Sequence, residues 1–166
     1  MRKEKDMTTE KRKHLAAWFS IIFIFVTLAS LFYIVKEENH KCTGGKEMIA
    51  LGCDHGGYEL KQEIIKYLEE NHIEYQDFGC DSTDSTDYPI YAKRVAIAIQ
   101  NGDCEKGILV CGTGIGISIT ANKFKGIRAA LCSDCFSAEA TRLHNNANIL
   151  AMGGRVVGPG LAVKIV

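Results

Sequence analysis

The sequence feature that most constrains the fold is a regular alternation of short apolar runs with longer amphipathic segments from residue 48 onward. Each apolar run has the length of a buried strand, and each amphipathic segment has apolar residues at helical spacing. Such an alternation predicts a parallel β-sheet with helices on both faces. The strands are expected at 48–53, 73–78, 107–111, 127–132 and 148–152. The helices are expected at 58–70, at 89–100, from the Gly-rich turn after the third strand to 123, at 137–144, and from 159 onward.

The predicted domain is a Rossmann-like three-layer α/β sandwich over residues 48–166, with a five-stranded parallel sheet in the order 2-1-3-4-5. In that order the topological switch point lies between strands 1 and 3, and ligands bind at the carboxyl ends of the strands beside it. Asp54 and His55 follow strand 1, and Cys111 begins a Gly-rich turn after strand 3. These two stretches are therefore expected to meet in one crevice.

The Gly-rich turn 111–116 reads CGTGIG and stands between a buried strand and the start of a helix. Its glycines allow backbone N–H groups to point inward and bind an anion, and a thiol there could act as a base or a nucleophile. A dinucleotide-binding loop is one alternative, although Ile117 stands where that fingerprint has a glycine and the loop follows the third strand. A purely structural turn is the other.

Two histidines lie at predicted element ends. His55 is in a loop, where histidine is usually a solvated side chain, but its place at the switch point favours a functional role. His144 and Asn145 end a helix just before the fifth strand, and we expect them to face the same carboxyl edge. A helix C-cap would explain them equally well, since histidine suits the helix dipole and Asn146 tolerates the left-handed conformation, and both interpretations can hold together.

Composition excludes several other functions. The formal net charge is zero and no basic stripe is present, so nucleic acid is not an expected partner. The seven cysteines are an odd and scattered set, which indicates reduced thiols and not a disulfide framework. Cys132 and Cys135 have CxxC spacing, but no second pair of cysteines or histidines stands near them to complete a zinc site.

Several motifs in one order give the domain a specific resemblance. Nearly all of 48–166 resembles ribose-5-phosphate isomerase type B and its relatives that isomerise galactose 6-phosphate or allose 6-phosphate. The motifs are GCDHGGYELK at 52–61, DFG at 77–79, STDYP at 85–89, GILVCGTGIGISITANK at 107–123, GIRAA at 126–130, HNNANIL at 144–150 and GGRVVG at 153–158. No part of the resemblance extends to residues 1–47.

The resemblance implies an aldose–ketose isomerase that interconverts ribose 5-phosphate and ribulose 5-phosphate through a cis-enediolate. It implies that Cys111 is the base that removes the C2 proton, and that no metal or organic cofactor takes part. The resemblance also implies that the N–H groups of Gly112, Gly114, Ile115 and Gly116 stabilise the negative charge, and that Thr113 moves a proton between O1 and O2. His144 would open the sugar ring together with Asp54. His55 and Arg155 would bind the phosphate, and Tyr88 and Asn145 would line the sugar site.

Two alternatives stay open at this point. The substrate could be a six-carbon sugar phosphate, or the domain could be a non-catalytic sugar-phosphate-binding fragment. Members of the family continue through a longer final helix and an arginine-bearing tail, whereas this chain stops at Val166. The resemblance implies a homodimer, and we expect the shorter carboxyl end to impair dimer formation and weaken phosphate binding.

Residues 1–47 have a different character. The stretch 15–35 contains no charged residue and is long enough to cross a hydrocarbon core of ~30 Å, which predicts one transmembrane-like helix between a charged amino terminus and a linker. A cleaved signal peptide is the alternative. We expect a membrane-anchored protein with its catalytic domain in the cytoplasm, where its substrate is. The excess of Lys and Arg before the stretch argues for the opposite orientation.

Overall fold

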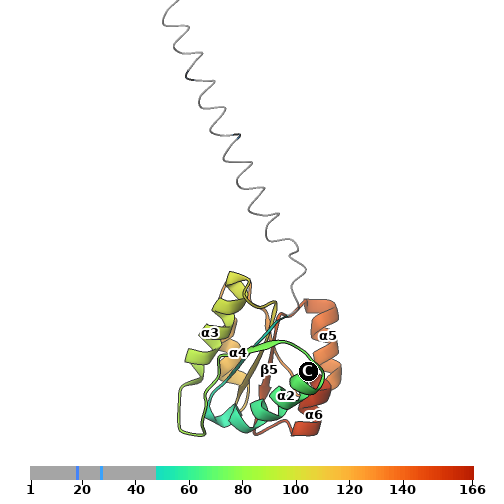
Figure 1. The fold of residues 1–166 in the computed structure, drawn as a ribbon. Coiled ribbons are helices and arrows are strands. Elements are labelled where there is room, and N and C mark those ends of the chain that lie inside the picture. Colours follow the sequence, from blue (N-terminus) through green and yellow to red (C-terminus); the bar gives the residue numbers. More distant parts are fainter. Residues whose placement is uncertain (1–17, 19–26, 28–47) are drawn as a thin grey trace, which may run out of the picture. The chain divides into compact units, whose positions relative to one another are not determined.

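The computed structural model describes Trp18, Thr27 and residues 48–166. Within 48–166 strands and helices alternate along the chain, as predicted (Figure 1). Their bounds are β1 Ile49–Cys53, the 3-10 helix η1 His55–Gly57, α2 Tyr58–Glu70, β2 Tyr75–Asp77, α3 Tyr88–Asn101, β3 Lys106–Cys111, α4 Ile115–Ala121, β4 Ala129–Leu131, α5 Cys135–Asn145, β5 Ile149–Gly153 and α6 Pro159–Ile165.

The sheet is parallel and five-stranded, but its order is β2-β1-β3-β5-β4, so the predicted order 2-1-3-4-5 is wrong. Burial explains the exchange of the last two strands. The β5 sequence ILAMG is apolar and almost wholly buried, which suits a position between two neighbours. The shorter β4 is only half-buried and ends at Leu131, which is 44% exposed, so it takes the edge.

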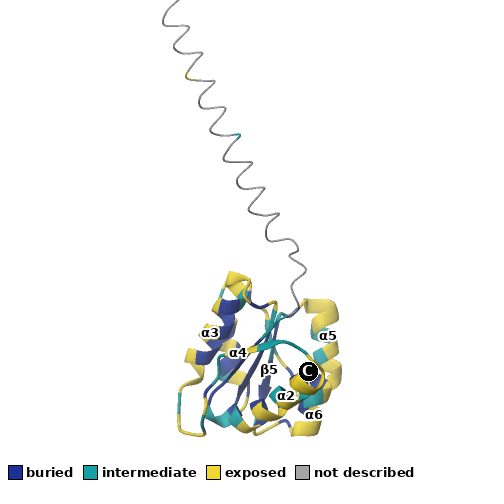
Figure 2. Cartoon of the chain, in the orientation of Figure 1, coloured by how far each residue is buried: buried dark blue, intermediate teal, exposed yellow. Residues whose placement is uncertain are grey.

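Alternating side chains of the central strands build two hydrophobic layers, one on each face of the sheet. Figure 2 colours the central strands mostly as buried. On one face, Leu51, Ile108 and Val110 pack with apolar residues of α2 and α6. On the other face, Leu109 and Ala151 pack with apolar residues of α3 and α4. The central strands are therefore covered on both sides, and their carboxyl ends emerge at a single edge of the sheet.

The predicted transmembrane-like helix over 15–35 is not retained. Apart from Trp18 and Thr27, that stretch lies outside the residues that the structure describes. Among the described residues, no helix has both the length and the apolar character needed to cross a bilayer. The longest of them, α3, has 14 residues, against about 20 for a membrane span. The membrane as a partner and the membrane-anchored location were both predicted from this stretch, and both predictions are wrong.

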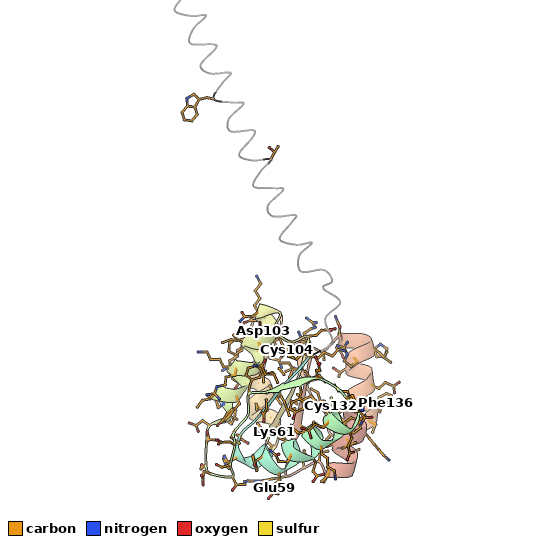
Figure 3. All side chains as sticks on the ribbon, in the orientation of Figure 1. Glu59, Lys61, Asp103, Cys104, Cys132 and Phe136 are labelled. Carbon is orange, nitrogen blue, oxygen red and sulfur yellow. The ribbon has the colours of Figure 1, made fainter. Side chains whose placement is uncertain are left out.

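A buried lysine ties α2 to the end of β2. The side chain of Lys61, which Figure 3 labels on α2, is 2% exposed. Its ammonium donates to Asp77 Oδ2 at 2.6 Å and to the carbonyl of Cys80 at 2.7 Å. Burial alone would lower the pKa of Lys61, but the hydrogen bond to Asp77 and the nearby Cys53 and Cys80 outweigh it and raise that pKa. The charged ammonium thus anchors the start of the loop that runs from 78 to 87.

Replacement of this ammonium should destabilise the domain. We expect Lys61→Met to lower the free energy of unfolding by about 2–4 kcal/mol, because Asp77 and the Cys80 carbonyl lose their buried donor. The raised pKa means that the contribution is fully present below the ordinary lysine pKa of about 10.4 and disappears only as the pH rises through the folded value. Denaturant unfolding at neutral pH measures the loss. Lys66→Met, at an exposed position of the same helix, is the control, and an equal effect there would contradict the prediction.

Close backbone contact places η1 on the end of β3. A Cβ atom at Gly57 would lie 2.5 Å from the carbonyl oxygen of Val110 and 2.6 Å from its carbonyl carbon. Neither atom can move aside as the tip of a flexible side chain could. Only glycine therefore allows the Asp54–His55 loop to rest on the strand that ends at Cys111.

A methyl group at this contact should push the two loops apart. We expect Gly57→Ala to lower the free energy of unfolding by about 1–3 kcal/mol. Gly160→Ala is the matched control, since a Cβ there meets nothing within 4 Å, and its stability should be unchanged or slightly raised. Thermal unfolding of the two variants compares them. Equal stabilities would show that the Val110 backbone yields without cost.

Candidate active site

The sulfur of Cys111 lies at the carboxyl end of β3, inside the turn that follows it. Cys111 is 4% exposed, and the N–H of Gly114 donates to its Sγ at 3.1 Å. Gly114 has φ +77°, in the left-handed region, and a Cβ there would also lie 2.5 Å from Leu131. Glycine at this position thus lets the chain wrap around the thiol before α4 begins. The hydroxyl of Thr113, exposed in the same turn, accepts from the N–H of Ile115 at 3.3 Å.

Loops from three adjacent strands meet at this edge. The N–H of Gly154 donates to the carbonyl of Cys111 at 2.8 Å, and the N–H of Arg155 donates to the carbonyl of Gly112 at 3.1 Å. On the other side, a Cβ at Gly56 would lie 3.0 Å from the amide nitrogen of Gly112. The loop after β3 is therefore held between the loops after β1 and β5. The loops that begin at Asp54 and at Cys111 are thus adjacent, and that they form one crevice stays a prediction.

A pocket of about 250 Å³ opens where the loops after β1 and β5 face each other. It is lined by His55, Gly56, Glu59, Leu60, Thr83, Gly154 and Arg155. The Arg155 side chain also runs past Gly112, with its Cδ and Nε 3.8 Å from the place of a Cβ there. An imidazole and a guanidinium thus flank a small polar pocket beside the Cys111 turn, and these groups suit the binding of a phosphate.

Tyr88 covers the start of α4. It is the first residue of α3 and is 37% exposed, and a Cβ at Gly116 would lie 2.5 Å from its ring carbon Cζ and 2.8 Å from its hydroxyl. Ile115 beside it is 52% exposed. The phenol is therefore brought to the Gly-rich turn from a helix on the α3–α4 face, as a residue lining the mouth of the site would be.

Asp54 is buried at the same edge, 6% exposed, where its Oδ1 accepts from the N–H of Gly57 at 3.1 Å. This bond caps η1, so the carboxylate shapes the loop that presents His55. Three buried thiols outside this turn are poorly suited to be bases. Burial is the main cause that raises the pKa of Cys53, Cys104 and Cys132. In the described part of the chain, no three His, Cys, Asp or Glu side chains are grouped as metal ligands.

His144 and Asn145 are not brought to this site within one chain, so the expectation that they face the carboxyl edge is wrong. They end α5, which returns antiparallel to the strands, and both are exposed. Hydrogen bonds from Arg128 to Asn146 and Asn148 hold this end beside the starts of β4 and β5. Cys111 lies at the opposite end of β3, about 16 Å away along the strand by the usual rise of 3.3 Å per residue.

Among residues with polar side chains at or near the pocket, the sequence prediction gave no role to Glu59, Thr83 or Thr86. Thr86 is half-buried, and its backbone N–H donates to Nδ1 of His55 at 3.1 Å. The motif STDYP pointed to this loop, because polar residues before a helix-starting proline often belong to a shaped turn. Nothing in the local sequence, however, indicated that the loop would fold back over His55.

The chain is similar in sequence to proteins of one family. A model of the family described as Ribose/Galactose Isomerase matches residues 49–166. Ribose-5-phosphate isomerase B of Escherichia coli is 55% identical over 118 residues, which cover 71% of this chain and 79% of that protein. Ribose-5-P isomerase B of Listeria innocua is 52% identical over 117 residues, which cover 70% of this chain and 79% of that protein.

A solved structure agrees with these relatives. The chain superimposes on ribose-5-phosphate isomerase B of Clostridium thermocellum with a TM-score of 0.70 at 52% identity, over 71% of this chain and 80% of that one. The match includes the Gly-rich turn 111–116, which therefore belongs to an isomerase domain and not to a dinucleotide-binding one. Fold, site and relatives agree that this chain belongs to the ribose/galactose isomerase family and is a sugar-phosphate isomerase.

Proposed function

We propose that residues 48–166 interconvert ribose 5-phosphate and ribulose 5-phosphate, with Cys111 as the base. The observation that carries this proposal is the position of Cys111 at the carboxyl end of β3, in a turn whose Gly112 lies against Gly56 and the Arg155 side chain. The two relatives described above carry names that specify the same five-carbon substrate.

The reaction needs a proton acceptor near C2 of the open-chain sugar and a means of stabilising an enediolate. Cys111 accepts the C2 proton and later returns a proton to C1, so one thiol serves both half-reactions. The backbone N–H groups of 112–116 stabilise the negative charge of the cis-enediolate, and each well-placed donor of this kind is worth about 10²–10³-fold in rate. The hydroxyl of Thr113, exposed in the same turn, moves a proton between O1 and O2.

The phosphate end of the substrate fits the pocket between the loops after β1 and β5. His55 and Arg155 supply donors from opposite sides, and Gly56 and Gly154 let the ligand approach the backbone. Glu59 is the one carboxylate among the lining residues, and it would oppose an anion placed too near α2. The substrate would thus lie with its phosphate at His55 and Arg155 and its carbonyl end at the Cys111 turn, where Tyr88 covers the sugar.

His144 and Asn145 can serve this reaction only from a second copy of the chain. They lie at the amino edge of their own sheet, exposed, and about 16 Å from Cys111 along β3. If two copies pack so that this edge of one covers the site of the other, His144 reaches the ring oxygen of the substrate and assists ring opening. Asp54 would then act on the same step from the copy that holds Cys111.

The role of Cys111 can be tested by near-isosteric replacement. We expect Cys111→Ser to lower kcat for ribose 5-phosphate by about 10²–10⁴-fold with the fold intact, because a serine hydroxyl gives up its proton far less readily than a cysteine thiol and is a poorer base. Cys135→Ser is the control, since Cys135 is an exposed free thiol outside the site. Galactose 6-phosphate assayed in parallel should turn over more slowly. Full activity of Cys111→Ser would overturn the assignment of the base.

The supply of His144 from a second copy can be tested by mixing inactive variants. Cys111→Ala and His144→Ala should each lack activity, but co-expression should restore about a quarter of the wild-type rate. Half of a random set of dimers would be mixed, and each mixed dimer would hold one complete site of two. A mixture as inactive as its parents would show that His144 does not act across copies.

A further inference from the structure

Two thiols lie in contact at the start of the loop 78–87. Cys53 is the last residue of β1, and Cys80 follows the end of β2. They are 27 positions apart in the chain, yet their sulfur atoms lie 3.6 Å from each other. Both are buried and both are free thiols. The proposed proton transfer at Cys111 uses neither of them, so it does not explain why two thiols face each other here.

The backbone fixes this contact. The N–H of Cys80 donates to the carbonyl of Cys53 at 3.0 Å, so the loop begins alongside the end of β1. Chains joined in this way lie about 4.8 Å apart, within the range of about 4.4–6.8 Å that separates the Cα atoms of disulfide-bonded cysteines. A Cβ at Gly79 would lie 2.8 Å from the Cys53 amide nitrogen, so glycine lets the loop pack this closely. A bond needs the sulfurs to approach from 3.6 Å to about 2.05 Å.

A buried ammonium lies near both thiols. Lys61 donates to the carbonyl of Cys80 at 2.7 Å, and the nearness of Cys53 and Cys80 is among the causes that raise its pKa. A nearby cation favours the thiolate, which is the reactive form of cysteine. Burial nevertheless raises the pKa of Cys53, and Cys53 is 0% exposed whereas Cys80 is 6% exposed. Cys80 is therefore the thiol that meets an oxidant first, and Cys53 is the thiol that reacts with the oxidised sulfur.

We propose that Cys53 and Cys80 form a redox-active pair that hydrogen peroxide converts into a disulfide. The Cys80 thiolate attacks one peroxide oxygen and the O–O bond breaks, which gives a sulfenic acid at Cys80 and, with one proton, water. The Cys53 thiol then gives up its proton as its sulfur attacks the Cys80 sulfur, the S–O bond breaks, and the hydroxyl leaves as water. Two thiols lose two electrons in total, and one peroxide gains them. A dithiol reductant reverses the reaction by exchange.

The disulfide acts on the pocket through the loop. Residues 81–87 are mostly exposed, whereas β1 is held between β2 and β3, so the loop moves when the sulfurs approach. Thr83 of this loop lines the pocket together with His55 and Arg155. Oxidation therefore moves Thr83 from its place and weakens the binding of an anion in the pocket. This effect rests on the proposed function for the identity of the ligand, whereas formation of the disulfide does not depend on it.

Peptide mapping of the full chain tests the bond. Trypsin places the two thiols in separate peptides, 47–61 and 67–93, and each of these holds a single cysteine. After treatment with hydrogen peroxide and alkylation of the remaining thiols, we expect the two peptides as one linked species, lighter by two hydrogens than their sum and separated by dithiothreitol. The exposed Cys135 shows whether the oxidant acted. Oxidation of Cys135 without the linked species would overturn the proposal.

Single variants test the order of the two steps. In Cys53→Ser the sulfenic acid at Cys80 has no thiol partner, so dimedone should trap it there. Cys80→Ser should give neither a trapped acid at Cys53 nor linked peptides. Cys104→Ser, which removes a buried thiol outside the pair, is the matched control and should keep the linked peptides. Trapping at Cys53 alone would overturn the assignment of the two thiols, and the wild-type map decides the bond if a serine variant fails to fold.

Binding of inorganic phosphate is the second readout, because peroxide can also oxidise Cys111 and so lower turnover directly. The oxidised wild type should bind phosphate about 2–5-fold more weakly than the reduced form, dithiothreitol should restore the affinity, and Cys80→Ser should show no change. Equal affinities of the two wild-type forms would overturn the effect on the pocket. Absence of ribose 5-phosphate turnover in the reduced wild type would instead reject the proposed function, and the linked peptides would still decide the disulfide.

Discussion

The site depends on the pairing of β3 between β1 and β5. Parallel pairing in register, with Cys53 opposite Val110 and Cys111 opposite Gly153, brings the ends of all three strands to one edge. The loops that follow then contact each other through backbone atoms, at Gly57 against Val110 and at Gly154 against Cys111. Because these contacts involve main-chain atoms of the strand ends, the backbone positions that carry Cys111, His55 and Arg155 are set before any substrate binds.

The role of each polar group follows from its contacts in the fold. The Cys111 sulfur is enclosed by its own turn, with the Gly114 N–H directed at it. Lys61 is buried and fully engaged by Asp77 and the Cys80 carbonyl, so it anchors the loop 78–87 and is not free for a ligand. The same loop carries Thr86 to His55. An internal ion pair is thus connected through one loop to the phosphate end of the proposed site.

Most of the fold and much of the site could be predicted from local patterns. The period of the apolar residues located the strands and helices of 48–166 to within a few residues, and the glycines of 111–116 marked the loop that encloses Cys111. The order of the last two strands could not be predicted, because it depends on which strand is apolar on both faces. Local sequence made β4 and β5 look alike, and burial separated them. The predicted membrane helix had no counterpart among the described residues.

The sequence by itself determined the chemistry that is present: a thiol in a Gly-rich turn, an Asp–His pair after the first strand, and motifs specific to one family of isomerases. The tertiary structure alone decided which groups meet. It placed Arg155 beside Gly112, because β5 and not β4 adjoins β3, and it placed His144 at the far edge, because a helix between parallel strands must run back along them. It also joined Thr86 to His55, since contact between residues far apart in a chain depends on packing that no local pattern records.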